Sequence, residues 1–272
     1  VYKRQVQTSR KSLLMCLPAK EVMAVVEMSW NKYFVHRENG CLEQRLSDGR
    51  LIWKQNKNMK NFRIILASNS PRRKELLAGL DIPFEVKVIQ GIDESYPESL
   101  PAYETALYIA VKKAEAYRPL LDSAINQQES SDDIRNHELL ILTADTVVIA
   151  PSSEEQNDQE GKGIILGKPK DAADAIRMLE MLSGKTHHVV TGVCITSQEK
   201  QRQFSVITEV TFKKLSKNEI DYYVEHYKPF DKAGAYGIQE WIGYIGCTSL
   251  KGSYFNVMGL PVQRIYEELK KF

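Results

Sequence analysis

The sequence predicts an α/β protein, because apolar runs of strand length alternate along the chain with segments of helical periodicity. Residues 62–67 (FRIILA) and 138–150 (ELLILTADTVVIA) are apolar runs of the kind that form buried strands. Residues 103–117 (YETALYIAVKKAEAY) repeat their apolar positions at the spacing of one helix face. The sequence contains no internal repeat, so we expect one α/β body.

The first strand, residues 62–67, is predicted to lead directly into a helix. Ser70 is a favoured N-cap residue and Pro71 suits the first helical position. The helix is expected to end near Gly79. A second strand over residues 84–89 (FEVKVI) then precedes the amphipathic helix described above.

Two polar stretches border the long apolar run. Residues 122–138 are rich in Ser, Gln, Asp and Asn, and we expect a surface loop there. Residues 151–163 are also polar. They are predicted to form a hairpin insertion that returns as residues 163–169 (GIILGKP).

The C-terminal part of the chain continues the alternation. Gly184 is expected to stop a helix over residues 171–183. Ser216 and Glu219 have the spacing of a capping box, so they mark the start of a further helix. The other expected elements are two strands, a glycine-rich stretch and a final helix, at residues 187–197, 203–215, 234–259 and 262–272.

Charge is distributed unevenly along the chain, although the net charge is only +2. Residues 1–58 hold 11 of the 37 basic and 5 of the 35 acidic residues, a balance of +6, so the rest of the chain has a balance of −4. The chain opens on Val1 and residues 30–58 show little periodicity, so we expect residues 1–58 to be a leader outside the fold. Met59 reads as a natural start, which predicts a body over residues 59–272.

Composition narrows the cellular setting and the class of partner. No apolar run is long enough to span a membrane, and none of the four cysteines are spaced as a CxxC pair. This cysteine usage is typical of the reducing cytoplasm. A body with a negative balance lacks the basic surface expected of a nucleic-acid-binding protein, but it is compatible with a few cations in one pocket.

Asp145 interrupts the apolar run of residues 138–150. Burying an unpaired carboxylate is costly, since even a neutral polar group costs ~2–7 kcal/mol. A strand end that faces solvent would avoid this cost, but apolar residues continue on both sides of Asp145. We therefore interpret Asp145 as a general base or a metal ligand.

Arg72 and Arg73 place two positive charges at the start of a helix, where the helix dipole disfavours cations. Two solvated surface arginines are the common alternative. However, the pair follows a strand-to-helix turn of small residues, a geometry in which backbone N–H groups bind phosphate, and arginine donors match phosphate oxygens. The stretch "SNSPRR" lacks the GK[ST] ending of a Walker A motif, so it predicts an anion site of another kind.

Other candidates are weaker when each is taken alone. Four of them would ordinarily be surface charges: Glu94, Lys113, Lys168 and Glu240. Gln239 ends a glycine-rich loop and offers both a donor and an acceptor, enough to read the edge of a base. His187 and His188 are adjacent on a predicted strand and would point to opposite faces, so we assign them structural roles.

Together these segments resemble the Maf family of nucleoside triphosphate pyrophosphatases, also called septum formation proteins. The matching stretches follow the family's order within residues 62–261: "LASNSPRRKELL", "GIDES", "KKA", "TADTVV", "LGKP", "MLSGKTHHVVTGV", "DKAGAYGIQ" and "GSYFNVMGLP". Each motif alone is weak, whereas the ordered set is specific. The leader has no counterpart in the family, and residues 122–138 and 151–163 are longer than usual.

The resemblance implies a mixed twisted sheet flanked by helices, with two lobes and a central cleft. It implies hydrolysis of a nucleoside triphosphate to the monophosphate and pyrophosphate with a divalent cation, Mg²⁺ or Mn²⁺, in nucleotide-pool sanitation or restraint of cell division. Asp145 would activate water and, with Glu94, would hold the metal. The substrate would be bound by Ser68, Arg72, Arg73, Lys113, Thr146, Lys168 and Gln239.

Within the family, "AYGIQ" resembles the subgroup that acts on dTTP and UTP, in which Arg72, Thr146 and Gln239 would be the specificity positions. Glu240 stands where a glycine commonly follows the glutamine. One alternative is a pyrophosphatase for 7-methyl-GTP or another modified nucleotide. Another is a nucleic-acid-binding regulator of division, against which the negative balance of the body counts. A homodimer is left open.

Overall fold

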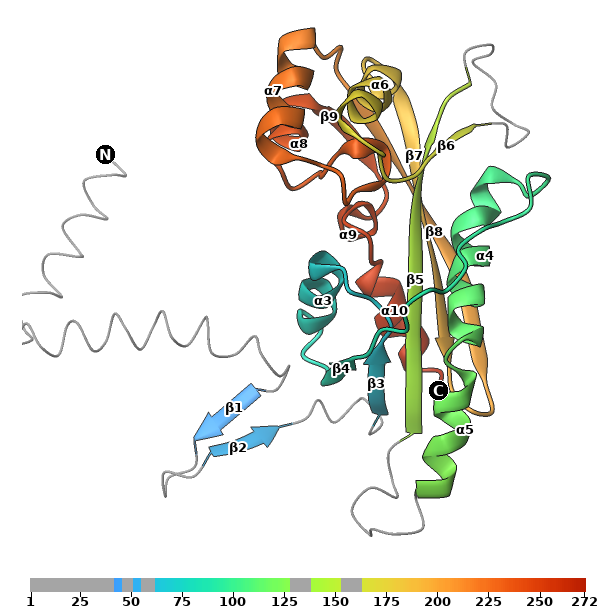
Figure 1. Cartoon of the computed structure of the whole chain (residues 1–272). Coiled ribbons are helices and arrows are strands. Elements are labelled where there is room, and N and C mark those ends of the chain that lie inside the picture. The colour runs from blue at the N-terminus through green and yellow to red at the C-terminus, as the bar shows by residue number, and fades with distance from the viewer. Residues whose placement is uncertain (1–41, 46–50, 55–61, 128–137, 153–162) are drawn as a thin grey trace, which may run out of the picture.

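The computed structural model describes residues 42–45, 51–54, 62–127, 138–152 and 163–272 (Figure 1). Its main body is a seven-stranded mixed sheet flanked by helices, which confirms the predicted α/β class. The strand order is β4-β3-β5-β7-β8-β9, and β6 pairs with β5 beside this path. No helix among the described residues is both long and apolar enough to cross a membrane.

Two short strands precede the body. β1 (Leu42–Arg45) and β2 (Leu51–Lys54) pair antiparallel as a two-stranded sheet of their own, which sequence periodicity did not predict. The rest of the expected leader lies outside the described residues. The exclusion of residues 1–58 from the fold therefore stays a prediction.

The first half of the main sheet is parallel, with β3 lying between β4 and β5 and running parallel to both. Its elements are β3 (Phe62–Leu66), α3 (Pro71–Ala78), β4 (Phe84–Val86), α4 (Ala102–Glu115), α5 (Arg118–Gln127) and β5 (Glu138–Ala150). The predicted start of α3 is confirmed, because Pro71 is the first helical residue and the Ser70 side chain accepts a hydrogen bond from the Arg73 N–H.

The predicted surface loop at residues 122–138 is wrong in its first part, because α5 continues to Gln127. Leu121 on this helix is buried and packs with Ile65 and Ile141. Burial of this apolar contact outweighs the polar composition that indicated a loop. Residues 128–137 lie outside the described residues.

The second half of the sheet is antiparallel, with β5, β7, β8 and β9 as successive neighbours. β6 folds back on β5, which confirms the predicted hairpin return. The glycine-rich stretch at residues 234–259 proves to contain most of a 3₁₀ turn, two short α-helices and a strand, which its glycine content concealed. The elements are β6 (Ile164–Leu166), α6 (Ala172–Leu182), β7 (Thr186–Thr196), β8 (Gln201–Phe212), α7 (Lys217–Tyr227), η2 (Ala233–Ala235), α8 (Trp241–Gly246), β9 (Cys247–Lys251), α9 (Tyr254–Val257) and α10 (Val262–Leu269).

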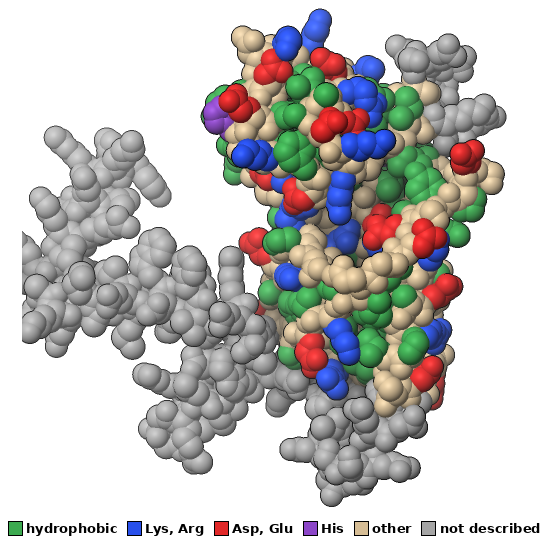
Figure 2. Space-filling model, in the orientation of Figure 1, with side chains coloured by type: hydrophobic (Ala, Val, Ile, Leu, Met, Phe, Trp, Pro, Cys, Tyr) green, Lys and Arg blue, Asp and Glu red, His purple; other side chains and the backbone are tan. Residues whose placement is uncertain are grey.

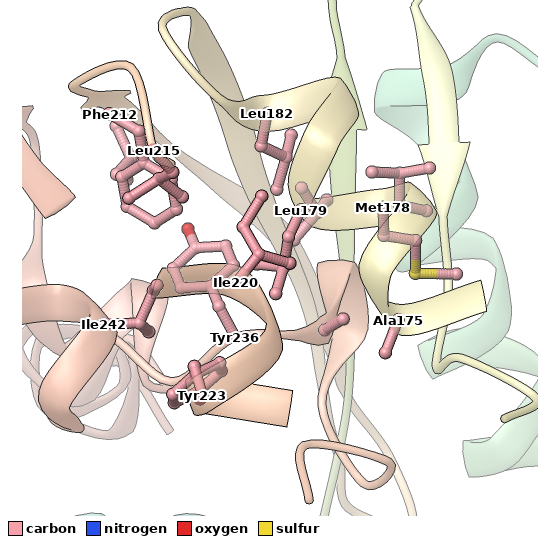
Figure 3. Packing of buried hydrophobic residues seen from close by; sticks show 14 of the residues in the cluster. Ala175, Met178, Leu179, Leu182, Phe212, Leu215, Ile220, Tyr223, Tyr236 and Ile242 are labelled. Atoms are coloured by element: carbon pink, nitrogen blue, oxygen red, sulfur yellow. The ribbon is translucent and has the colours of Figure 1, made fainter. Parts of the chain in front are cut away.

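Helices cover both faces of the sheet (Figure 1). α4 packs on β5 and β7 from one face. On the opposite face, one apolar cluster joins α3 and α10 to the sheet and includes Leu77 and Ile265. A second cluster joins α6, α7 and α8 and includes Leu179 and Tyr223 (Figure 3). The two clusters are the cores of two lobes.

His187 and His188 lie on opposite faces of β7, as predicted. His187 is fully buried, its Nε2 lies 2.8 Å from the Tyr236 hydroxyl, and burial lowers its pKa to about 3, so it is neutral near pH 7. His188 Nδ1 lies 3.0 Å from the Tyr103 hydroxyl. Each ring therefore bonds a tyrosine on its own side of the sheet, which agrees with structural roles.

Candidate active site

A cavity of about 770 Å³ lies between the two lobes, where Figure 2 shows basic and acidic side chains meeting in a hollow. The cavity is lined by all nine residues that the family resemblance assigns to the site: Ser68, Arg72, Arg73, Glu94, Lys113, Asp145, Thr146, Lys168 and Gln239. They come from segments that lie far apart in the sequence. The fold brings them to one place, and the role of each remains a prediction.

Asp145 and Thr146 reach the same cavity although neighbours in a strand point to opposite faces. The reason is a gap along one edge of β5. β3 pairs with β5 only as far as Leu142, and β6 begins to pair at Val148. No described strand lies beside residues 143–147 on that edge, so both side chains border one open space.

Asp145 is held by Lys113, which comes from α4. The Lys113 Nζ lies 2.8 Å from Asp145 Oδ1 and 3.0 Å from Glu94 Oε1. The side chains of Lys113 and Asp145 are 13% and 16% exposed, so their ion pair is largely shielded from solvent, whereas Glu94 is 56% exposed. One ammonium group therefore fixes two carboxylates at the cavity wall.

α4 reaches this position because Gly192 lets the helix approach the sheet closely. Gly192 lies opposite Asp145 in the pairing of β5 with β7. A Cβ atom at residue 192 would lie 2.3 Å from the Cα and N atoms of Leu107, which are backbone atoms of α4. The helix that carries Lys113 thus packs closely on Gly192, beside Asp145.

Arg73 occupies the gap beside β5 from the face of the sheet that lies opposite to α4. Its Nη1 donates to the Ala144 carbonyl at 2.8 Å, its Nη2 to Thr146 Oγ1 at 3.0 Å and its Nε to the Gly259 carbonyl at 2.8 Å. Burial lowers the pKa of Arg73, against the opposing effect of the Asp145 charge. All three acceptors are uncharged, so Arg73 contributes a positive charge that no hydrogen-bonded acid cancels.

Arg72 is paired with an acid that sequence analysis missed. Its Nη1 lies 2.6 Å from Asp231 Oδ2, and its Nη2 donates to the Asp231 carbonyl at 3.3 Å. The second carboxylate oxygen, Oδ1, lies 2.7 Å from Lys232 Nζ. Partial burial acts to raise the pKa of Asp231, but hydrogen bonds from Lys232 and Arg72 lower it to about 2. The only sequence signal for Asp231 is its place at the start of "DKAGAYGIQ", the stretch that ends at Gln239.

Lys168 and Gln239 each present a polar group without a partner in the described part of the chain. Lys168 is exposed and makes no hydrogen bond or ion pair with those residues. Gln239 Oε1 is buried and accepts no hydrogen bond from them. A buried carbonyl oxygen without a donor is costly, so Gln239 is the clearest sign of a ligand contact. Ser68, by contrast, accepts a hydrogen bond from the Ser70 N–H at 3.2 Å.

Glu240, at which this sequence departs from the subgroup pattern, is not part of the cavity lining. Its Oε1 lies 3.0 Å from Lys232 Nζ, and its Oε2 accepts a hydrogen bond from the Tyr223 hydroxyl. Lys232, which does line the cavity, is thereby buried between two carboxylates. The departure at residue 240 therefore does not add a side chain to the cavity lining.

Comparison with known proteins identifies the family. The Maf-like protein family matches residues 63–272, which include every cavity residue named above. The chain belongs to the Maf family. A dTTP/UTP pyrophosphatase of Phocaeicola vulgatus is 55% identical over 214 residues, which cover 79% of this chain and 98% of the relative. Proteins of the same name from Parabacteroides distasonis and Porphyromonas gingivalis are each 51% identical over 215 residues, covering 79% of this chain and 98% and 96% of those relatives.

Proposed function

We propose that this Maf-family protein hydrolyses nucleoside triphosphates, with dTTP and UTP preferred, to the nucleoside monophosphate and pyrophosphate. The observation that carries the proposal is the shared cavity. There a shielded pair of Asp145 and Lys113, the charged Arg73 and Gln239, whose buried side-chain oxygen has no partner among the described residues, line one space. The relatives named dTTP/UTP pyrophosphatase support this proposal.

Asp145 is the proposed general base. It accepts a proton from a water molecule as the water oxygen attacks the α-phosphorus, the bond from that phosphorus to the bridging oxygen breaks, and pyrophosphate leaves. Lys113 orients the carboxylate through their 2.8 Å contact. Arg73 and Lys168 stabilise the negative charge that develops on the leaving group.

A divalent cation, Mg²⁺ or Mn²⁺, is part of the proposal. Glu94 and Asp145 fit such an ion, because both offer carboxylate oxygens and both lie within 3.0 Å of the same Lys113 nitrogen. Within the described residues no group of three or more His, Cys, Asp or Glu side chains is placed to hold a metal. Two carboxylates plus phosphate oxygens of the substrate suit Mg²⁺. When bound, the ion would neutralise charge on those oxygens.

Gln239 is the proposed reader of the base. Uracil and thymine share a carbonyl beside an imide N–H, and a glutamine amide pairs with both groups. The buried Gln239 Oε1 would accept from the imide N–H. Cytosine has an acceptor in place of that N–H, so it would leave the oxygen unpaired.

The substitution Gln239→Ala tests this reading. Losing one buried hydrogen-bonded contact costs about 1–3 kcal/mol, or roughly 5- to 150-fold. We expect kcat/KM for UTP to fall by that factor and the lead of UTP over CTP to narrow, with the fold intact. The measurement is pyrophosphate release from UTP, dTTP, CTP, GTP and 7-methyl-GTP in the presence of Mg²⁺ or Mn²⁺.

Gln263→Ala is the matched control, because Gln263 is an exposed glutamine that does not line the cavity. It should leave the ratio between UTP and CTP unchanged. A wild-type preference for 7-methyl-GTP, or an unchanged ranking in the Gln239 variant, would contradict the base-reading role and favour the modified-nucleotide alternative.

We further propose that residues 59–272 form the functional unit. The family match beginning at residue 63 and the near-complete coverage of the relatives support this boundary. A fragment of residues 59–272 is expected to melt and turn over UTP as the full chain does, because the described residues that line the cavity all follow Met59. Thermal melting and pyrophosphate release measure both properties, and a large loss of either would show that the leader contributes.

The cytoplasm is the proposed location of the reaction. Cys194 and Cys247, the two cysteines in the described part of the chain, are both free, as is usual in a reducing compartment. The homodimer stays a prediction, which sedimentation of the purified chain would test.

A further inference from the structure

Arg72 and Gln239 are two of the three proposed specificity residues. A chain of polar contacts at the cavity wall links Arg72 to residues that flank Gln239. Its five members are Tyr223, Glu240, Lys232, Asp231 and Arg72. Lys232 and Asp231 line the cavity with Arg72, whereas Tyr223 and Glu240 do not. Any effect of these last two residues on the substrate must therefore pass through their neighbours.

Tyr223 links the two ends of residues 237–240, the segment that carries Gln239. The tyrosine lies on α7 and is fully buried. Its hydroxyl accepts a hydrogen bond from the Gly237 N–H at 3.0 Å and donates to Glu240 Oε2. Burial raises the pKa of Tyr223, so the hydroxyl keeps its proton near neutral pH. The Tyr223 side chain thus holds the Gly237 backbone, two residues before Gln239, and the Glu240 side chain, one residue after it.

Glu240 links this bond to a buried cation. Its Oε1 lies 3.0 Å from Lys232 Nζ, and Lys232 is only 8% exposed. A buried ammonium group requires acidic partners, and the second partner is Asp231, at 2.7 Å. Since Asp231 also holds Arg72 at 2.6 Å, the position of Arg72 depends on the same set of contacts.

The backbone of this segment also needs to be held. Gly234 and Ala235 have φ values of 68° and 58°, in the left-handed region that a residue with a Cβ atom adopts at a cost. Gly237 lies so close to Glu240 that a Cβ atom there would be 2.8 Å from the Glu240 Cδ. Such a conformation persists only where surrounding contacts determine it.

We propose that Tyr223 and Glu240 are positioning residues for base selection, which hold the segment on both sides of Gln239 and hold Arg72 through Lys232 and Asp231. The inference rests on the proposed base reading by Gln239. It assigns to Glu240, a departure from the subgroup pattern, a role in the selection of the substrate.

The test uses Tyr223→Phe in the full chain. Loss of the hydroxyl leaves the buried Gly237 N–H and one Glu240 oxygen without their partner. We expect the ratio of kcat/KM for UTP to that for CTP to fall about tenfold, the factor that corresponds to one hydrogen bond. The change should appear mainly as a higher KM for UTP, since Asp145 and Lys113 are untouched.

Ser183→Ala is the matched control, because Ser183 does not line the cavity. Its hydroxyl likewise accepts a backbone N–H, from Leu215 at 2.8 Å, and donates to the Leu215 carbonyl at 3.4 Å. This variant should lower the melting temperature to a similar extent without changing the ratio between UTP and CTP. An equal change of ratio in both variants would show a general loss of order and would overturn the proposal.

Comparison with Gln239→Ala, alone and combined with Tyr223→Phe, separates this inference from the proposed function. In the double variant Tyr223→Phe, Gln239→Ala the ratio should match that of Gln239→Ala alone, because residues that act through one contact are not additive. If Gln239→Ala changes the ratio and Tyr223→Phe does not, the positioning role is wrong and the proposed function stands. If Gln239→Ala has no effect on the ratio, the base reading fails and this inference fails with it.

Glu240→Gln provides a second test of the proposal, which can be used if the Tyr223 variant does not fold. It keeps the shape of the side chain, but the amide nitrogen must face either the Lys232 ammonium or the Tyr223 hydroxyl, and the negative charge near Lys232 is lost. We expect the ratio to fall in the same direction. A ratio equal to that of the wild type in this folded variant would overturn the role of Glu240.

Discussion

Replacing Asp145 with asparagine is expected to reduce turnover about 10²–10⁴-fold while the protein stays folded, because the amide removes general-base catalysis. An asparagine has nearly the same shape as aspartate, and its carbonyl oxygen can still accept a hydrogen bond from Lys113, now at 2.8 Å from the carboxylate. The Asp145 side chain is 16% exposed, so few water molecules could reach it to compensate for the lost carboxylate. The rate of pyrophosphate release from UTP measures the effect.

The adjacent pair of Asp93 and Lys112 provides the control for this experiment. Lys112 Nζ lies 2.7 Å from Asp93 Oδ2, much as Lys113 does from Asp145, but Asp93 is 68% exposed and is not part of the cavity lining. Asp93→Asn should therefore keep turnover near that of the wild type. Activity like the wild type in a folded Asp145→Asn variant would mean that another residue activates the water.

Replacing Gly192 with alanine is expected to lower both stability and activity. The new Cβ would lie 2.3 Å from the backbone of Leu107, and backbone atoms of a helix cannot move aside singly, so α4 must shift as a unit. Overpacking of this kind costs about 1–3 kcal/mol. The shift also moves Lys113 away from Asp145, and a misplacement of about 1 Å can cost roughly 10²-fold in rate.

Melting temperature and kcat/KM for UTP measure the two effects of Gly192→Ala. Gly167→Ala is the control for stability, because a Cβ at residue 167 meets no atom within 4 Å. It should leave the melting temperature unchanged. A Gly192 variant as stable and active as the wild type would show that α4 does not need this close approach to the sheet.

Local signals in the sequence determined most of the regular structure. Ser70 and Pro71 mark the start of α3, and the capping box of Ser216 and Glu219 at α7 is complete in both directions. These signals act between residues a few positions apart, so they can be read without knowledge of the fold. The same is true of the long apolar run that became β5. Composition failed where a contact with distant residues decided the outcome, as it did for Leu121 on α5.

The residues of the candidate site likewise fall into two groups: those that sequence signals indicated and those that only contacts between distant segments revealed. The interruption of an apolar strand pointed to Asp145, and the ordered motifs pointed to the eight other cavity residues proposed with it. Sequence reasoning missed Asp231, because its partner Arg72 lies 159 residues away and only the packing of the two lobes brings them together. It likewise gave no sign that Glu240 would bind Lys232 behind the cavity wall.

The sequence by itself thus determined which residues are chemically able to bind a triphosphate and activate water. Only the tertiary structure decided that Asp145 and Thr146, on opposite faces of one strand, share a cavity. The physical reason is the strand order, since β3 ends its pairing at Leu142 and β6 begins its own at Val148. The edge of β5 between them is left to Arg73, which bonds the Ala144 carbonyl and Thr146 there. No local pattern encodes that gap, because it depends on where two other segments of the chain stop pairing.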